Sequence, residues 1–174
     1  NVMKKFNKEG LIKAFSYDLK SWDALTGNCK NRYYDIWALR LNKNNWTSLH
    51  SKLWKKCLDY DCWDMLTHKA NIGLNEKNIH IKSYQVNTPD DFNLIQVDSA
   101  FNGIGIYKVS KINKCRYVGF TQFCSCEKYN CKFGPCIWVK CEHVSFHADM
   151  VKKNNAKIFI CPQLIIKDQP EHLL

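Results

Sequence analysis

This sequence of 174 residues lacks long apolar runs and is poor in glycine and proline. No run approaches the roughly 20 apolar residues that a membrane-spanning helix needs, so no transmembrane segment is expected. The first residues do not continue into the apolar core of a signal peptide. Only 7 glycines and 4 prolines are present, which excludes collagen-like and low-complexity chains. We therefore expect a soluble chain, or a piece of a longer one, and both the cytoplasm and the secretory lumen remain open as its location.

The composition that remains is that of an ordinary globular protein. Hydrophobic residues make up 45% of the sequence and its length corresponds to about one domain, so residues 1–174 are expected to share one core. The formal net charge is +10 at pH 7. Such a charge attracts nucleic acids, nucleotide phosphates and anionic lipids. The lysines are spread along the chain, however, which fits a merely solubilising surface equally well.

Ten cysteines are present, but no two are separated by the pair of residues typical of a zinc knuckle. Cysteines and histidines are dense in the last third of the chain, and structural zinc, disulfides and free thiols all remain possible there. The group consists of Cys124, Cys126, Cys131, Cys136, Cys141, His143, His147 and Cys161.

Hydrophobic periodicity predicts helices and strands in alternation. A helix is expected from Trp46 to about Leu66, and another over residues 141–152. Strands are expected at residues 33–41, 94–97, 97–109 and 157–162, the last one ended by its proline. This mixture favours an α/β or α+β domain.

Three further segments are predicted mainly from turn signals. Residues 4–18 are expected to form a short helix or an extended lead-in. Residues 17–28 are predicted to be a loop that ends in a Gly-Asn turn. Residues 75–91 are predicted to be a second loop with a short strand at 79–81.

The segment 97–108 is an apolar strand pattern interrupted by two glycines next to Asn102, which suits a backbone that turns closely around a bound group. Its Gly-Ile-Tyr at 105–107, followed by Tyr-Val-Gly at 117–119, also matches the paired signature of GIY-YIG nucleases. That fold needs an arginine on the following helix, and no arginine occurs after Arg116. A nuclease is therefore a remote alternative.

Three chemically active side chains stand together on the helix expected after Cys141. His143 and His147 lie one helical turn apart on one face, with Glu142 next to the first of them. The arrangement suits metal or proton chemistry. The alternative is a set of structural hydrogen bonds.

Four segments, in this order, resemble the glycosyltransferases of large DNA viruses, which are in turn distantly similar to fungal capsule-associated mannosyltransferases. They are Trp-Asp-Ala-Leu at 22–25, Tyr-Tyr-Asp-Ile-Trp-Ala-Leu-Arg at 33–40, Ser-Ala-Phe-Asn-Gly-Ile-Gly-Ile-Tyr-Lys at 99–108 and Cys-Glu-His-Val-Ser-Phe-His at 141–147. The resemblance covers roughly residues 15–165. It includes the Gly-Ile-Tyr of the nuclease signature within a longer block.

The resemblance implies the α/β fold of A-type nucleotide-sugar glycosyltransferases, with a mixed, mostly parallel sheet flanked by helices. The implied activity is glycosylation, the transfer of a hexose from a nucleotide sugar to a hydroxyl group of a glycan or protein. Such enzymes use Mn²⁺ or Mg²⁺ to stabilise the leaving diphosphate. The expected location is the cytoplasm of a virus-infected cell or the virion, and nucleic acid is not an expected partner.

The resemblance also implies roles for individual residues. Glu142 would be the catalytic base or would hold the acceptor hydroxyl, and His143 or His147 would bind metal or phosphate. Asp23 and Asp35 would lie near the donor. Trp37 would pack against the sugar or face it. Asn102 and Gly103 would shape the sugar pocket. Lys108 and Arg116 would neutralise phosphate.

The sequence departs from the family in one respect. The family's Asp-x-Asp metal motif follows a hydrophobic strand. The only Asp-x-Asp in this sequence, formed by Asp59 and Asp61, falls in the helix predicted from Trp46 to about Leu66. The chain therefore resembles the C-terminal part of such a domain, without its first nucleotide-binding β-α-β unit. It is expected to be either a fragment of a longer polypeptide, for which a protein partner is then an option, or a shortened relative that has lost donor binding and has a structural or interaction role.

Overall fold

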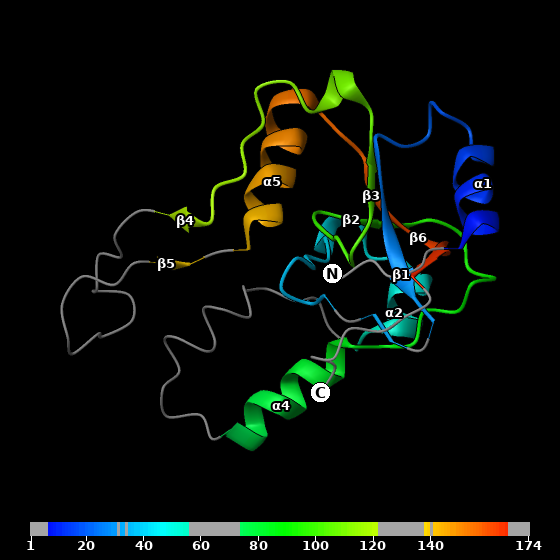
Figure 1. Ribbon diagram of the computed structural model, residues 1–174. Helices are drawn as coiled ribbons and strands as arrows, with labels where there is room; N and C mark the ends of the chain where they lie inside the picture. The colour runs from blue at the N-terminus through cyan, green and yellow to red at the C-terminus, as the bar shows by residue number, and fades with distance from the viewer. Residues whose placement is uncertain are drawn as a thin grey trace.

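The structure is a computed structural model that describes residues 7–30, 32–33, 35–55, 74–121, 138–139 and 141–166. Its centre is a four-stranded sheet in the order β2-β6-β1-β3 (Figure 1). Strands β1 and β6 are parallel, while β3 and β2 run antiparallel to their neighbours. The strands are β1 Ala24–Cys29, β2 Ile95–Val97, β3 Gly105–Tyr107 and β6 Ile158–Ile166. A mixed α/β fold is thus confirmed, but only one of the three strand pairs described in this sheet is parallel.

The helices and the remaining short elements surround this sheet. The helices are α1 Lys8–Ser16, α2 Ser48–Leu53, α4 Leu74–Tyr84 and α5 Glu142–Asn154. Two 3-10 turns, η1 Lys43–Asn45 and η2 Val109–Lys111, and a separate pair of strands, β4 Phe120–Thr121 and β5 Trp138–Val139, complete the described elements. None of the described helices reaches the length and apolarity that crossing a lipid bilayer requires.

Helices cover both faces of the sheet, α5 on one and α1 on the other (Figure 1). Because side chains alternate along a strand, neighbouring residues of β6 enter different cores. Ile160 belongs to the larger core, which includes Met150 of α5. Cys161 belongs to a smaller core with Ala14 of α1. The central strands are therefore buried on both faces.

Strand β1 lies where the sequence predicted a loop ending in a Gly-Asn turn, and that prediction was wrong. All six of its residues are buried, so it lacks the polar alternation by which half-exposed strands are recognised. Gly27 is needed because a Cβ there would lie 2.5 Å from Cγ2 of Ile104. A glycine in a strand here marks close approach and not a turn.

The strand predicted at residues 33–41 was also wrong. Its described residues form a turn at 36–38 and a single β-bridge from Arg40 to Ser99. The backbone N–H of Ala38 donates to Oδ1 of Asp35 across 3.2 Å. This side-chain bond to the backbone three residues on favours a turn over a strand.

Helix α4 occupies residues 75–84 of the loop predicted at 75–91, including the short strand expected at 79–81, whereas residues 85–91 are a loop as predicted. Ile81 and Tyr84 are both buried, at 5% and 3% exposure, and they lie three residues apart on one side of the helix. The rest of the helix is rich in asparagine and lysine. Two buried apolar positions, with Ile79 exposed between polar residues, are too few to give a helical period that the sequence alone reveals.

The other predicted elements are confirmed in whole or in part. Helix α5, strand β2 and helix α1 lie where they were expected, while α2 confirms only residues 48–53 of the helix predicted from Trp46. The remainder of that helix, from residue 56, and Asp59 and Asp61 lie outside the described residues. Strand β6 does not end at Pro162 as predicted. The pairing register with β1 shifts between Ile160 and Ile165, so the proline, which has no backbone N–H, does not need to donate a hydrogen bond to β1.

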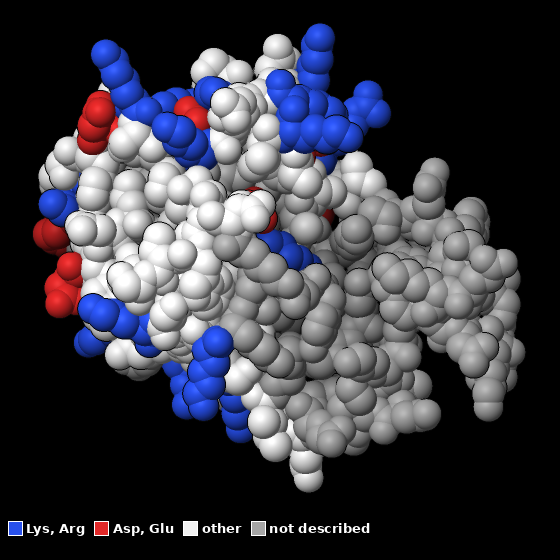
Figure 2. Space-filling view, turned by 180° about the vertical axis from the view of Figure 1, so that it is seen from behind, with Lys and Arg blue, Asp and Glu red and all other residues white. Residues whose placement is uncertain are grey.

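Among the described residues on the face seen in Figure 2, charged side chains are distributed without a single dominant patch. Lysine and arginine side chains stand there in several separate groups, with acidic side chains near some of them. The described residues on that face therefore form no continuous basic surface of the kind that binds nucleic acid.

Candidate functional site

The candidate site is built around His143, in the first turn of α5. Its imidazole stacks on the ring of Phe101, with centroids 3.9 Å apart and planes inclined by 21°. The ring of Tyr117 meets it edge-on, with centroids 5.3 Å apart. Nδ1 of His143 lies 3.5 Å from Oε1 of Glu142 and 3.9 Å from Sγ of Cys141. The imidazole is thus held by aromatic rings and faces a carboxylate and a thiol.

Two carboxylates act electrostatically on this imidazole. Burial lowers the pKa of His143 below its ordinary value, and the charges of Glu142 and Asp35 offset part of that effect. Burial also raises the pKa of Asp35, and the neighbouring Glu142 adds to the rise, while Ala38 N–H and His143 oppose it. Asp35 and Glu142 are 107 positions apart in the sequence, and the fold brings both to the same imidazole.

Asn102 holds Asp35 in place. The backbone N–H of Asp35 donates to Oδ1 of Asn102 across 3.1 Å, and Asn102 is fully buried. Asn102 and Gly103 have φ of 63° and 85°, in the left-handed region that glycine adopts readily and asparagine tolerates. The Asn-Gly pair predicted to shape a binding pocket is therefore a tight turn that positions one carboxylate of the site.

His147, one turn further along α5, is fully buried. Its Nδ1 is hydrogen-bonded to Oγ of Ser99 at 2.9 Å and its Nε2 to the hydroxyl of Tyr107 at 3.1 Å. Burial, with a smaller contribution from His143, lowers the pKa of His147 to about 3, so the ring is neutral near pH 7. Both ring nitrogens are engaged within the protein, and we assign this residue a structural role.

One group of side chains has the spacing of metal ligands. Cys141, Glu142 and His143 each offer one ligand atom, and these atoms lie within 4.8 Å of one another. The carboxylate and imidazole suit Mn²⁺ as well as Zn²⁺, whereas the thiol suits Zn²⁺ and disfavours Mg²⁺. The other cysteines of the predicted zinc group, apart from Cys161, lie outside the described residues.

Asp23 lies away from this group, just before β1, whereas Asp35 follows the other end of that strand. The carboxylate of Asp23 accepts hydrogen bonds from Nζ of Lys108 at 3.1 Å and from the backbone N–H of Lys157 at 2.9 Å. Nζ of Lys111 is 3.9 Å away. Burial alone would raise the pKa of Asp23, but these contacts outweigh it and lower the pKa below its usual value. In this structure Lys108 thus neutralises a buried carboxylate.

The other two predicted binding residues, Trp37 and Arg116, have their described contacts with other parts of the fold. Trp37 is half-buried and packs against the larger core. Arg116 is exposed, and its backbone N–H donates to Asp149 across 3.2 Å. Of the residues predicted for the site, the fold therefore brings together Asp35, Asn102, Gly103, Glu142 and His143.

Sequence reasoning missed four residues that complete the site. Phe101 and Tyr117 pack on His143, and Ser99 and Tyr107 bind His147. Tyr117 was noted only in the nuclease signature. Phe101 had one available signal, its place directly before the Asn-Gly turn.

Comparisons of the chain with protein-family models, with curated proteins and with solved structures found no match. The resemblance to viral glycosyltransferases therefore stays a prediction, and the functional argument rests on the site itself.

Proposed function

We propose that this chain is a nucleotide-sugar-dependent glycosyltransferase, or part of one, with Asp35, Glu142 and His143 at its reaction centre. The observation that carries the proposal is that Glu142 lies 3.5 Å from an imidazole fixed by Phe101 and Tyr117, with the charge of Asp35, from a distant segment, also acting on that imidazole. Sugar transfer needs a base for the acceptor hydroxyl and charge compensation for a leaving diphosphate. This group offers a carboxylate for the first role and, for the second, an imidazole that can bind a metal ion.

Glu142 is the proposed base. Its side chain is 55% exposed, so an acceptor can reach it, whereas Asp35 is half-buried and held by the Asn102 turn. The acceptor hydroxyl gives its proton to a Glu142 carboxylate oxygen as its own oxygen bonds to the sugar C1. The bond from C1 to the diphosphate breaks, and the nucleoside diphosphate leaves with that electron pair.

His143 and Asp35 have positioning and binding roles in this proposal. The imidazole, fixed by Phe101, lies 3.5 Å from Glu142 and orients its carboxylate. A divalent ion that supplies positive charge to the leaving diphosphate would be held by His143, which has the spacing of a metal ligand with its neighbour Cys141. The charge of Asp35 acts on the same imidazole.

A non-catalytic interaction protein is the second candidate. One observation favours it: Lys108, expected to neutralise phosphate, is bound to Asp23 near the far end of α5 from Glu142. A glycosyltransferase without that lysine needs another cation for its donor, and a structural protein does not.

A titration of the chain with nucleotide sugars tests the proposal. We expect UDP- or GDP-sugars at millimolar concentration to raise the melting temperature when Mn²⁺ is present and not when EDTA replaces it, because a ligand that binds only the folded state stabilises it. Glu142→Gln should keep this binding and lower transfer or donor hydrolysis by at least about 100-fold, the lower range for loss of a general base. Asp149→Asn, on the same helix, is the matched control and should keep full activity.

Two results would count against the proposal. If no nucleotide sugar shifts the melting temperature of the folded chain, the interaction protein becomes the preferred function. If donor binding occurs but Glu142→Gln transfers sugar at the wild-type rate, Glu142 is not the base.

A further inference from the structure

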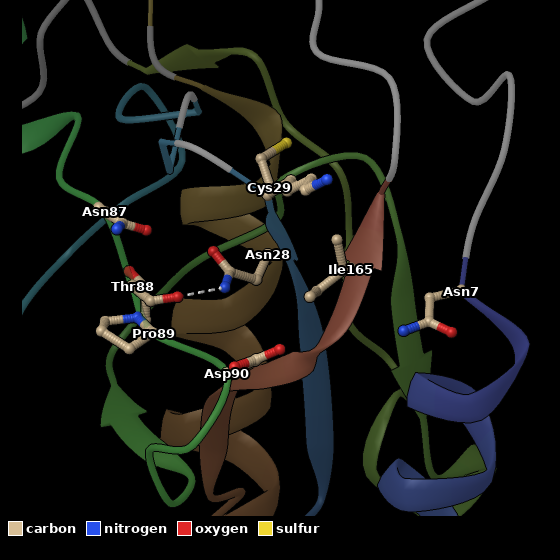
Figure 3. Close-up of a pocket in the computed structure, with 9 residues that line it drawn as sticks. Asn7, Asn28, Cys29, Asn87, Thr88, Pro89, Asp90 and Ile165 are labelled. Carbon is tan, nitrogen blue, oxygen red and sulfur yellow. Dashed lines mark hydrogen bonds between the residues drawn. The ribbon is translucent and has the colours of Figure 1, made fainter.

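A cavity of about 640 Å³ lies at the carboxyl ends of the parallel strands β1 and β6 (Figure 3). Its volume is within the range of about 300–1,000 Å³ found for small-molecule sites. In α/β folds ligands bind at the carboxyl ends of parallel strands. The cavity shares no lining residue with the group around His143, so it is a separate place on the molecule.

The amide of Asn28 forms part of the cavity wall and is fixed in orientation. Its Nδ2 donates to the carbonyl of Thr88 at 2.8 Å and to the carbonyl of Pro162 at 3.1 Å. Rotating the amide would put its oxygen against two carbonyl oxygens, so the orientation is settled by these two acceptors. Figure 3 shows the nitrogen directed at Thr88 and the oxygen turned away from it.

That oxygen is buried without a hydrogen-bond partner among the described residues. Asn28 is 1% exposed, and its Oδ1 accepts no hydrogen bond within the described part of the chain. Thr88 is 2% exposed, and its Oγ1 also has no hydrogen-bond partner among the described residues. A buried polar atom without a partner is costly, and most such atoms in folded proteins are satisfied. Both residues line the same cavity, so a molecule bound there is a candidate source of the missing hydrogen bonds.

The rest of the lining defines the chemistry of that molecule. The exposed Asn87 and Asp90 offer further oxygen and amide groups, and Lys30 contributes one cation. The nine described lining residues include no aromatic ring that would stack on a nucleobase. One lysine beside one aspartate does not make a site for a diphosphate. Hydroxyl groups, which both donate and accept, match this set of partners.

We propose that this cavity is a binding site for a neutral, hydroxyl-rich small molecule, a saccharide or a cyclic polyol, whose hydroxyls donate to Asn28 Oδ1 and pair with Thr88 Oγ1. The inference goes beyond the proposed glycosyltransferase activity and does not rest on it, because it uses none of the residues around His143.

The test is an NMR titration of the full 174-residue chain, labelled with ¹⁵N, in EDTA and without nucleotide. The probes are D-glucose, D-galactose, D-mannose, D-xylose and myo-inositol, raised to tens of millimolar. At least one probe should shift the side-chain amide signals of Asn28 and Asn87 in a saturable way. Since nucleotide and metal are left out, this result is independent of whether the chain transfers sugar.

Two threonine variants provide a matched comparison. Thr88→Val removes the hydroxyl of Thr88 at nearly constant side-chain shape and should lower the affinity for the probe by about tenfold. Thr26→Val removes another fully buried hydroxyl, whose Oγ1 donates to the carbonyl of Phe159 at 3.3 Å, away from the cavity, and should leave the affinity unchanged. Without ligand, Thr26→Val should lower the melting temperature, and Thr88→Val should keep or raise it.

A second cavity variant allows the proposal to be tested even if Thr88→Val folds poorly. Asp90→Ala removes an exposed carboxylate at the rim and should weaken the same probe. The proposal is overturned if no probe gives saturable shifts at Asn28, or if Asp90→Ala and every folded Thr88 variant bind as the wild type does.

Discussion

The imidazole of His143 lies against the phenyl ring of Phe101, with the two ring centroids 3.9 Å apart. The next residue along the chain, Asn102, binds the backbone of Asp35. One dipeptide therefore positions both the imidazole and a carboxylate that acts on it. The geometry of the site depends on the Asn-Gly turn at its base.

The first prediction concerns the titration of His143. Phe101 covers one face of the imidazole, and burial is the main reason that the pKa of His143 is lowered. Phe101→Ala should therefore raise the pKa of His143 toward its ordinary value of about 6.5. The measurement is an NMR titration of the histidine Cε1–H signals, with Phe15→Ala, an exposed ring on α1, as the control. An unchanged or lower pKa in Phe101→Ala would show that burial by this ring is not the cause.

The second prediction concerns acid stability. Burial lowers the pKa of His147 to about 3, whereas an unfolded histidine takes up its proton near pH 6.5. Between these values the unfolded state binds more protons than the folded state. The free energy of unfolding should therefore decrease as the pH falls, by up to about 1.4 kcal/mol per pH unit. Urea denaturation at pH 7, 6 and 5 measures the slope.

The variant His147→Gln has no titrating ring at this position, so its slope over the same pH range should be smaller. His143, whose pKa is also lowered, contributes in the same direction and leaves a residual slope. Equal slopes for wild type and His147→Gln would contradict the assignment, whatever the absolute stability of the variant.

The third prediction concerns the buried carboxylate before β1. Asp23→Asn removes the charge that pairs with Lys108 and should lower the free energy of unfolding by about 2 kcal/mol, typical for a hydrogen bond to a charged group. The matched control is Asp149→Asn, since Asp149 pairs with Lys153 at the surface, and exposed pairs of this kind contribute only about 0.3–0.5 kcal/mol. If urea denaturation gave equal decreases in the free energy of unfolding for the two variants, the Asp23–Lys108 pair would contribute no more to stability than a surface pair.

The fourth prediction concerns the contact of α1 with β6. Gly-to-Ala in a helix normally stabilises it by up to about 1 kcal/mol. At Gly10 the new Cβ would meet the carbonyl oxygen of Gln163, a backbone atom of β6. Gly10→Ala should therefore destabilise the protein by about 1–3 kcal/mol, as overpacking does. Lys13→Ala, on an exposed position of the same helix, is the control, and a gain in stability for Gly10→Ala would refute the close contact.

Local sequence patterns predicted those elements whose exposed and buried sides differ. Helix α5 has a clear apolar face with Phe146 and Met150, and its boundaries were predicted almost correctly. Strand β1 has no exposed side, and its Gly27 and Asn28 serve close packing and cross-strand hydrogen bonds. In a local pattern the same two residues indicate a turn, because the neighbouring strands that require them are far away in the sequence.

The candidate site shows the same limit. Helical spacing placed His143 and His147 on one face, and their ring centroids are 6.2 Å apart. Spacing does not show that one ring is closed off by Ser99 and Tyr107 while the other faces Glu142. Those differences arise from tertiary contacts, and they decide which histidine is available for chemistry.

The parallel pairing of β1 with β6 joins Ala24 to Ile158, residues 134 positions apart. A ribosome that adds about 5–20 residues per second needs roughly 7 to 27 s to make the intervening chain. During that time β1, a strand buried on both faces in the final fold, is without its parallel neighbour. We expect the nascent chain to rely on chaperones that shield such a strand until β6 has been synthesised.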